Sequence, residues 1–196
     1  MPPCETLYCV SASMHHYARA IAFATLKQFK EAEQEQALFH QSLTRIPENR
    51  RFFNNPARDT LAIAEKMIEG ELLYHTSDYR QAFEALRESV VRDDCLAYSE
   101  PWAWMHPPRH ALGALLLEQG HYAEAEQVYR TDLGLNGQLQ RCAQHPDNVW
   151  ALHGLVECLR HRNAVEETAC YEPRLARAVE LADVHIEASC LCRGRV

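Results

Sequence analysis

Glycine and proline are scarce in this chain, at 7 and 9 of its 196 residues, and the sequence contains no low-complexity tract. Both residues tend to interrupt helices, whereas long segments rich in alanine, leucine, glutamate, glutamine and arginine favour helix over strand. The scarcity of the first group and the abundance of the second predict an all-α fold. With 47% hydrophobic residues, the chain is long enough to bury a sizeable core.

Positive charge is also in short supply. Lys and Arg number 20 against 27 Asp and Glu, which gives a formal net charge of −7, and no basic cluster stands out. Nucleic-acid binding needs positive charge that neutralises phosphates, so a nucleic-acid partner is not expected. The sequence also lacks an apolar run of membrane-spanning length and a basic, then apolar leader. We therefore expect no membrane partner and a cytoplasmic location.

Motifs for catalysis are missing as well. No Gly-rich phosphate loop, paired-carboxylate motif or serine, histidine and aspartate arrangement emerges from the sequence. This lack favours a binding protein over an enzyme, and no cofactor is expected from it.

Cysteine is present but scattered. In a chain without a secretory signal, eight cysteines without a regular spacing predict reduced thiols rather than a disulfide framework. Cys158 stands between Glu157 and Leu159 in a segment of helical character, and we expect it to be a small core residue. The other seven are Cys4, Cys9, Cys95, Cys142, Cys170, Cys190 and Cys192.

The most specific pattern is a helical hairpin in residues 107–133. Leu112 supplies a core side chain, Gly113 allows the partner helix to approach closely, and Gly120 stands where a residue with positive φ ends the first helix. Three further residues then share one face of the second helix: Tyr122, Ala125 and Tyr129. The pattern resembles the tetratricopeptide repeat, a helical hairpin of about 34 residues.

Weaker copies of this hairpin occur on both sides. One contains Gly70, Tyr79 and Ala82, with Ser77 at the turn, and another contains Ala20, Phe29 and Ala32, with Lys27 at the turn. A fourth begins with Trp150 and Gly154, but its second helix departs from the pattern, and Pro173 is expected to break or kink it. We treat Ala20, Gly70, Gly113 and Gly154 as equivalent positions.

The resemblance implies a single helical-repeat domain over residues 1–196. Its form would be a right-handed α-solenoid of hairpins with long connections between the repeats. The hairpins are expected at about residues 13–46, 58–93, 107–135 and 148–182, followed by a tail at 183–196. Asp59 and Asn148 are expected to cap the helices that follow them.

A closer resemblance covers most of the chain from about residue 14 onward. Residues 100–113, 16–19, 148–155 and 182–184 resemble the C-terminal half of larger tetratricopeptide-repeat proteins of bacteria and fungi. Those proteins carry a further helical half upstream. The resemblance therefore implies a helical-repeat fold without a defined activity, and it leaves self-association or pairing with another repeat half as an expectation.

In such arrays the first helix of each hairpin lines a concave groove that binds protein or peptide segments. We therefore expect a protein- or peptide-binding scaffold. A groove with Glu71 and Glu118, and with no Lys or Arg at the mapped positions, favours a neutral or cationic ligand. The residues mapped to the groove are Tyr17, Ile21, Met67, Glu71, Tyr74, His75, His110, Ala114, Leu117, Glu118, Asn148, Ala151 and Leu155.

The alternative function is a zinc- or copper-dependent or biosynthetic enzyme component with a His/Glu site in the groove. His106 and His110 have the i, i+4 spacing of a helical chelate, although the prolines between them suggest that His106 precedes the helix. Cys190 and Cys192 add soft ligands near His185. The candidate metal ligands are His16, His106, His110, Cys190 and Cys192, with Glu71 or His75 nearby in the groove.

Overall fold

The computed structural model describes residues 7–193, so Cys4 and the last three residues of the expected tail lie outside the described part. Helices dominate it, and the described residues contain strand only as one pair of two-residue strands, which confirms the all-α expectation. The elements are α1 (Cys9–Thr25), α2 (Phe29–Leu43), β1 (Arg51–Phe52), β2 (Asn55–Pro56), α3 (Ala57–His75), α4 (Tyr79–Asp94), α5 (Pro108–Glu118), α6 (Tyr122–Asp132), the 3-10 helix η1 (Arg141–Ala143), α7 (Val149–His161) and α8 (Val165–Leu181). No helix in residues 7–193 is long and apolar enough to cross a membrane.

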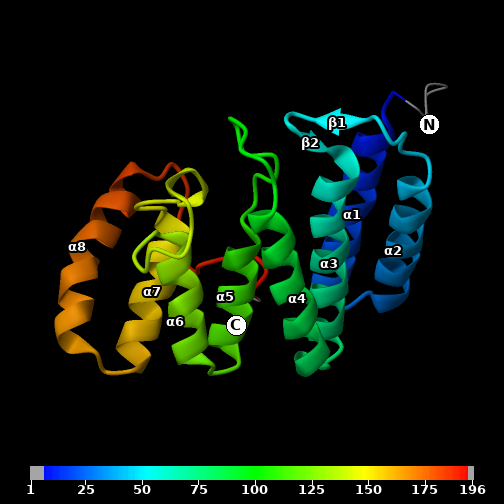
Figure 1. Cartoon of the computed structure of the whole chain (residues 1–196). Helices are drawn as coiled ribbons and strands as arrows, with labels where there is room; N and C mark the ends of the chain where they lie inside the picture. Colours follow the sequence, from blue (N-terminus) through cyan, green and yellow to red (C-terminus); the bar gives the residue numbers. More distant parts are fainter. Residues whose placement is uncertain (1–6, 194–196) are drawn as a thin grey trace. The chain divides into compact units, whose positions relative to one another are not determined.

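The first of two compact units comprises residues 1–108. In it α1 packs against α2 and α3, and α3 packs against α4 (Figure 1). The hydroxyls of Ser13 and Ser42 share a buried hydrogen bond of 2.6 Å between α1 and α2. The segment after α4 folds back within the unit, because Asn55 exchanges hydrogen bonds with the backbone of Ala97.

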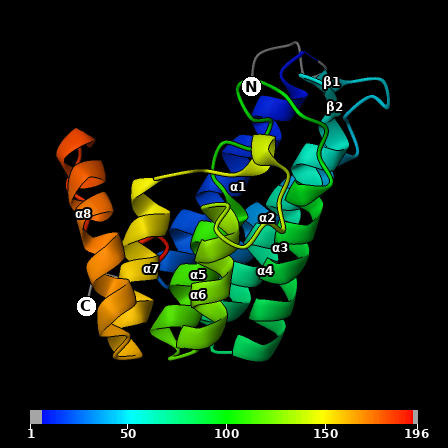
Figure 2. The same ribbon diagram turned by 60° about the vertical axis from the view of Figure 1, so that its left-hand side comes forward.

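The second unit comprises residues 109–196 and contains α6, α7, α8 and nearly all of α5. In it α6 packs against α7, and α7 packs against α8 (Figure 2). Cys158 of α7 is fully buried, which confirms the expectation of a core residue. Among the described residues every cysteine is a free thiol, in agreement with the expected reduced state.

Four turns between consecutive helices share one geometry. Each has a residue in the left-handed region: Lys27 (φ 59°), Ser77 (φ 70°), Gly120 (φ 78°) and Asn163 (φ 56°). In each turn the next helix begins two residues later, at Phe29, Tyr79, Tyr122 or Val165. Three of the turns therefore form without glycine, although this backbone conformation costs least for glycine.

The fourth turn, at Asn163, lies further along the chain than expected from Gly154. Lys27, Ser77 and Gly120 each lie seven positions after Ala20, Gly70 and Gly113, whereas Asn163 lies nine positions after Gly154. Measured from the turn, the equivalent of Gly113 is Val156, so the assignment of Gly154 was wrong by two residues. This shift changes which side chains of α7 correspond to those of α5.

The helix ends correct two further expectations. Asn148 caps α7, because its side chain accepts hydrogen bonds from the backbone of Trp150 and Ala151, as predicted. Asp59 was expected to cap the following helix, but α3 begins at Ala57 after Pro56, so Asp59 lies in the first turn. Pro173 does not end α8, which continues to Leu181. Because α8 is largely exposed, water can bond the carbonyl that lacks a partner there.

Candidate functional site

The second unit is organised around one tyrosine. Tyr129 of α6 is fully buried, and its ring lies between Gly113 of α5 and Gly154 of α7. A Cβ atom at Gly113 would lie 2.5 Å from Cζ of Tyr129, and one at Gly154 would lie 2.2 Å from the same atom. Only glycine fits at these two positions while the ring stays in place. The ring therefore places its hydroxyl between α5 and α7.

The hydroxyl of Tyr129 meets the C-terminal segment, by which we mean residues 182–193. It shares a buried hydrogen bond of 2.6 Å with the hydroxyl of Ser189. Burial raises the pKa of Tyr129 well above its usual value, more than the hydrogen bond from Ser189 lowers it. The tyrosine therefore remains neutral and can both donate and accept.

The C-terminal segment is packed rather than loose. Ile186, Ser189, Cys190 and Cys192 are each at most 8% exposed. In Figure 1 this segment is drawn in red and leaves the end of α8 to turn back towards α7. The predicted tail is thus, from residue 183 to residue 193, part of the packed second unit.

The end of the segment is fixed by charge. Nη1 of Arg193 donates to both carboxylate oxygens of Glu157 of α7, at 2.7 and 2.8 Å. Burial alone would lower the pKa of Arg193, but the hydrogen bonds with Glu157 and the negative charges of Glu157 and Glu118 raise it. Carboxylates from α5 and α7 therefore act together on one guanidinium group.

A cavity of about 620 Å³ opens between α7, α8 and the C-terminal segment. Burial lowers the pKa of His153 against the opposing effect of Glu157. The Nδ1 atom of His153 is buried and lies 3.8 Å from Glu157, too far for a hydrogen bond. The cavity is lined by Trp150, His153, Glu157, Arg160, Leu175, His185, Glu187, Ala188, Cys190, Leu191 and Arg193.

The lining residues of α7 follow from the corrected register. Sequence analysis mapped Asn148, Ala151 and Leu155 to the groove, counting from Gly154. A shift of two residues, as the position of the fourth turn requires, gives Trp150, His153 and Glu157. All three line the cavity, together with Arg160 of the same helix. We call the set formed by Glu118, Trp150, His153 and Glu157, together with the hydroxyl of Tyr129 that holds Ser189, the α5–α7 face.

A second polar cluster lies in the interior of the unit. Asp132 of α6 accepts hydrogen bonds from Nε2 of His110 at 3.0 Å and from Nδ1 of His145 at 2.9 Å. Burial alone would raise the pKa of Asp132, but the two histidines lower it to about 2. The backbone of His145 also donates to the carbonyl oxygen of Asp132 at 2.7 Å. The cluster therefore fastens the connection between α6 and α7.

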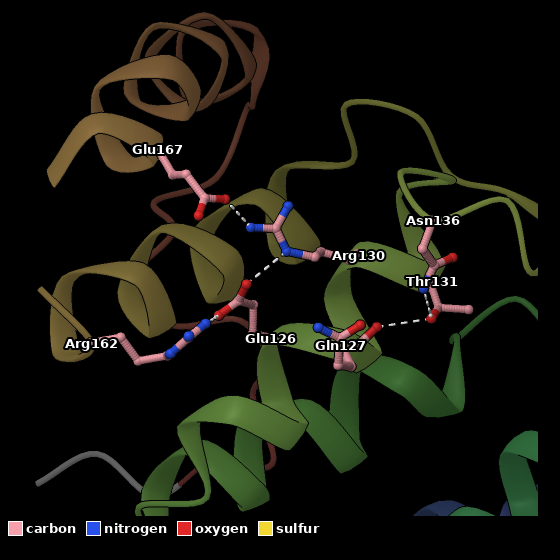
Figure 3. A network of polar contacts seen from close by, with 7 residues as sticks. All are labelled: Glu126, Gln127, Arg130, Thr131, Asn136, Arg162 and Glu167. Carbon is pink, nitrogen blue, oxygen red and sulfur yellow. Dashed lines mark hydrogen bonds and ion pairs between the residues drawn. The ribbon is translucent and has the colours of Figure 1, made fainter. Parts of the chain in front are cut away.

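A third network joins α6 to the last hairpin (Figure 3). The buried carboxylate of Glu126 accepts from Arg130 at 2.7 Å and from Arg162, and Arg130 also bonds Glu167 of α8. Burial raises the pKa of Glu126, but the two arginines lower it overall. Sequence analysis missed this network, although the i, i+4 spacing of Glu126 and Arg130 gave a signal for part of it.

The predicted groove residues occupy varied environments. In the first unit Tyr17 is half-buried and packs edge-on against Trp104, with ring centroids 5.4 Å apart, and His75 is half-buried. In the second unit Glu118 is exposed, and Asn148 is half-buried as the cap of α7. Ile21 of the first unit is also half-buried. The remaining eight are buried within their own unit: Met67, Glu71, Tyr74, His110, Ala114, Leu117, Ala151 and Leu155. Glu118 is thus the one that contributes to the α5–α7 face.

The candidate metal ligands have other partners. His16 hydrogen-bonds Glu35 at 2.7 Å, and His110 hydrogen-bonds Asp132. His106 precedes α5, as the prolines suggested, and is exposed. Cys190 and Cys192 are buried in the C-terminal segment. Within residues 7–193, no three His, Cys, Asp or Glu side chains are grouped in a way that could hold a metal ion.

No family model, curated protein or solved structure matches this chain.

Proposed function

We propose that the chain is a tetratricopeptide-like peptide-binding module and that the α5–α7 face of its second unit is the binding surface. The main observation is that this face holds an irregular stretch of polypeptide, the C-terminal segment. Ser189 of the segment hydrogen-bonds the hydroxyl of Tyr129, and the cation of Arg193 pairs with Glu157. A surface that binds one segment without regular secondary structure by such contacts has the groups required to bind another.

The charge of the face supports a neutral or cationic ligand. Glu118 and Glu157 both stabilise the positive charge of Arg193, and the guanidinium of Arg160 is already bonded to Glu172 at 2.7 Å. The aromatic ring of Trp150 and the half-buried imidazole of His153 add contact area beside the two carboxylates. An anionic peptide would bring like charges together at this surface and would bind less well.

The proposal is tested by comparing the affinities of peptides that differ in charge. The probes are three synthetic peptides of about ten residues that share their apolar residues and carry two positive charges, none, or two negative charges. The protein is the full chain with Arg193→Ala, which releases Glu157 from its internal partner. We expect the cationic peptide to bind about tenfold more tightly than the anionic one, as measured by isothermal titration calorimetry.

The matched control removes the same number of charges elsewhere. Adding Glu118→Gln and Glu157→Gln should abolish the charge preference, whereas adding Glu166→Gln and Glu180→Gln, on the exposed surface of α8, should preserve it. Equal affinity for the three peptides, or a preference that both double variants retain, would contradict the proposed binding surface.

A further inference from the structure

We infer that the C-terminal segment competes with the ligand for the α5–α7 face and carries similar chemical groups. This inference rests on the proposed function. The ligand would then be an irregular, turn-containing segment with a small hydroxyl residue and, four positions later, a cation. In the chain itself these are Ser189, which meets Tyr129, and Arg193, which meets Glu157.

The hydroxyl position accepts only a small residue. Ser189 is fully buried, and the hydroxyl of Tyr129 that it contacts is fixed by the fit of the ring between Gly113 and Gly154. A larger side chain at the ligand position of Ser189 would have to displace the ring or its neighbours. A threonine or serine can instead exchange the same hydrogen bond of 2.6 Å.

The position of Arg193 selects a cation because the carboxylates of Glu157 and Glu118 both act on it. Arg193 bonds both oxygens of Glu157, and the charge of Glu118 also raises its pKa. The side chain of Arg193 is 23% exposed and that of Glu157 is 22% exposed, so the pair stands at the edge of the face. A cation from another chain can reach Glu157 there once Arg193 moves away.

The segment can leave without unfolding a regular element. Residues 182–193 form neither helix nor strand, and their buried side chains are interspersed with exposed ones such as Leu191, which is 78% exposed. Side-chain contacts and burial therefore hold the segment in place. Because it is tethered to α8, it competes at an effective concentration that reaches the millimolar range for short flexible linkers.

Competition in trans tests this inference. The probe is a fluorescein-labelled peptide with the sequence of Val184–Arg193, kept reduced and followed by fluorescence anisotropy. We expect full-length Arg193→Ala to bind this peptide about tenfold more tightly than the wild type, because its own segment competes less well. Arg177→Ala, which removes an exposed arginine of α8 that pairs with Glu180, should bind it as the wild type does.

Two further arms separate this inference from the proposed function. Adding Glu157→Gln to the Arg193→Ala chain should abolish the gain, and a peptide with phenylalanine in place of Ser189 should not bind. Equal binding by the wild type and Arg193→Ala, still dependent on Glu157, would overturn the competition but leave the binding surface intact. Binding independent of Glu157 in every chain would overturn both.

Discussion

Replacing Gly154 by alanine is expected to lower the free energy of unfolding by about 3 kcal/mol, because the added methyl group overlaps the ring of Tyr129. The new Cβ would lie 2.2 Å from Cζ of Tyr129, closer than a Cβ atom comes to a non-bonded heavy atom in real structures. The ring cannot move aside easily, since it is fully buried, contacts Gly113 on its other side and is hydrogen-bonded to Ser189. Urea unfolding followed by circular dichroism measures the loss.

The effect of Gly154→Ala on the free energy of unfolding should change sign when the ring of Tyr129 is removed. Tyr129→Ala by itself should cost about 4 kcal/mol, because it deletes a large buried side chain. In that background Gly154→Ala fills vacated space and replaces a glycine inside a helix, so it should stabilise the chain by up to about 1 kcal/mol. A Gly154→Ala variant as stable as the wild type would show that the ring does not require glycine at this position.

Removing the carboxylate of Asp132 should be the second large effect. Asp132→Ala leaves the buried side chain of His110 without its carboxylate partner and removes the side-chain bond between His145 and α6, so we expect a loss of about 3 kcal/mol near neutral pH. The exposed carboxylate of Asp183 provides a matched control. Asp183→Ala should change stability by at most about 0.5 kcal/mol.

The pH dependence of stability gives an independent readout of this cluster. The pKa of Asp132 is about 2 in the folded chain, compared with an ordinary value of 3.8, which applies to the unfolded chain. The ionised carboxylate therefore stabilises the fold above about pH 4. That contribution, about 2 kcal/mol, should be lost as the pH falls from about 4 to about 2. The Asp132→Ala variant should lack this part of the acid transition. An identical acid dependence in the variant and the wild type would contradict the role assigned to the cluster.

Local sequence signals predicted most of the helices, although Pro173 was expected to break or kink the last one and α8 continues past it. Gly120 and Tyr122 mark the turn and the start of α6, and Asn148 caps α7 as its residue type suggests. The turns at Lys27 and Ser77 have the same backbone geometry without glycine. Their position followed only from comparison with the hairpin at residues 107–133, because no residue at either turn favours positive φ by itself.

The α5–α7 face was harder to predict for two physical reasons. In the fourth hairpin the turn residue is Asn163 rather than glycine, so counting from Gly154 gave a register two residues short and missed Trp150, His153 and Glu157. The contacts of Ser189 and Arg193 join positions far apart in the sequence. The C-terminal segment has no hydrophobic period that would place it against α7, so no local pattern indicated that it is packed.

The central claim is that the C-terminal segment occupies a peptide-binding face and can be displaced from it. Alkylation of the buried cysteines tests this claim most directly. Cys190 and Cys192 are buried in the segment, whereas Cys158 is buried in α7 and burial raises its pKa to about 12, so Cys158 reports global unfolding. Mass spectrometry of the wild-type chain with iodoacetamide measures all three rates in one sample.

A saturating, cysteine-free cationic peptide should raise the alkylation rates of Cys190 and Cys192 about fivefold or more and leave that of Cys158 unchanged, since displacement of the segment exposes the first two thiols alone. Unchanged rates for Cys190 and Cys192 at saturation, or a parallel rise at Cys158, would contradict the account.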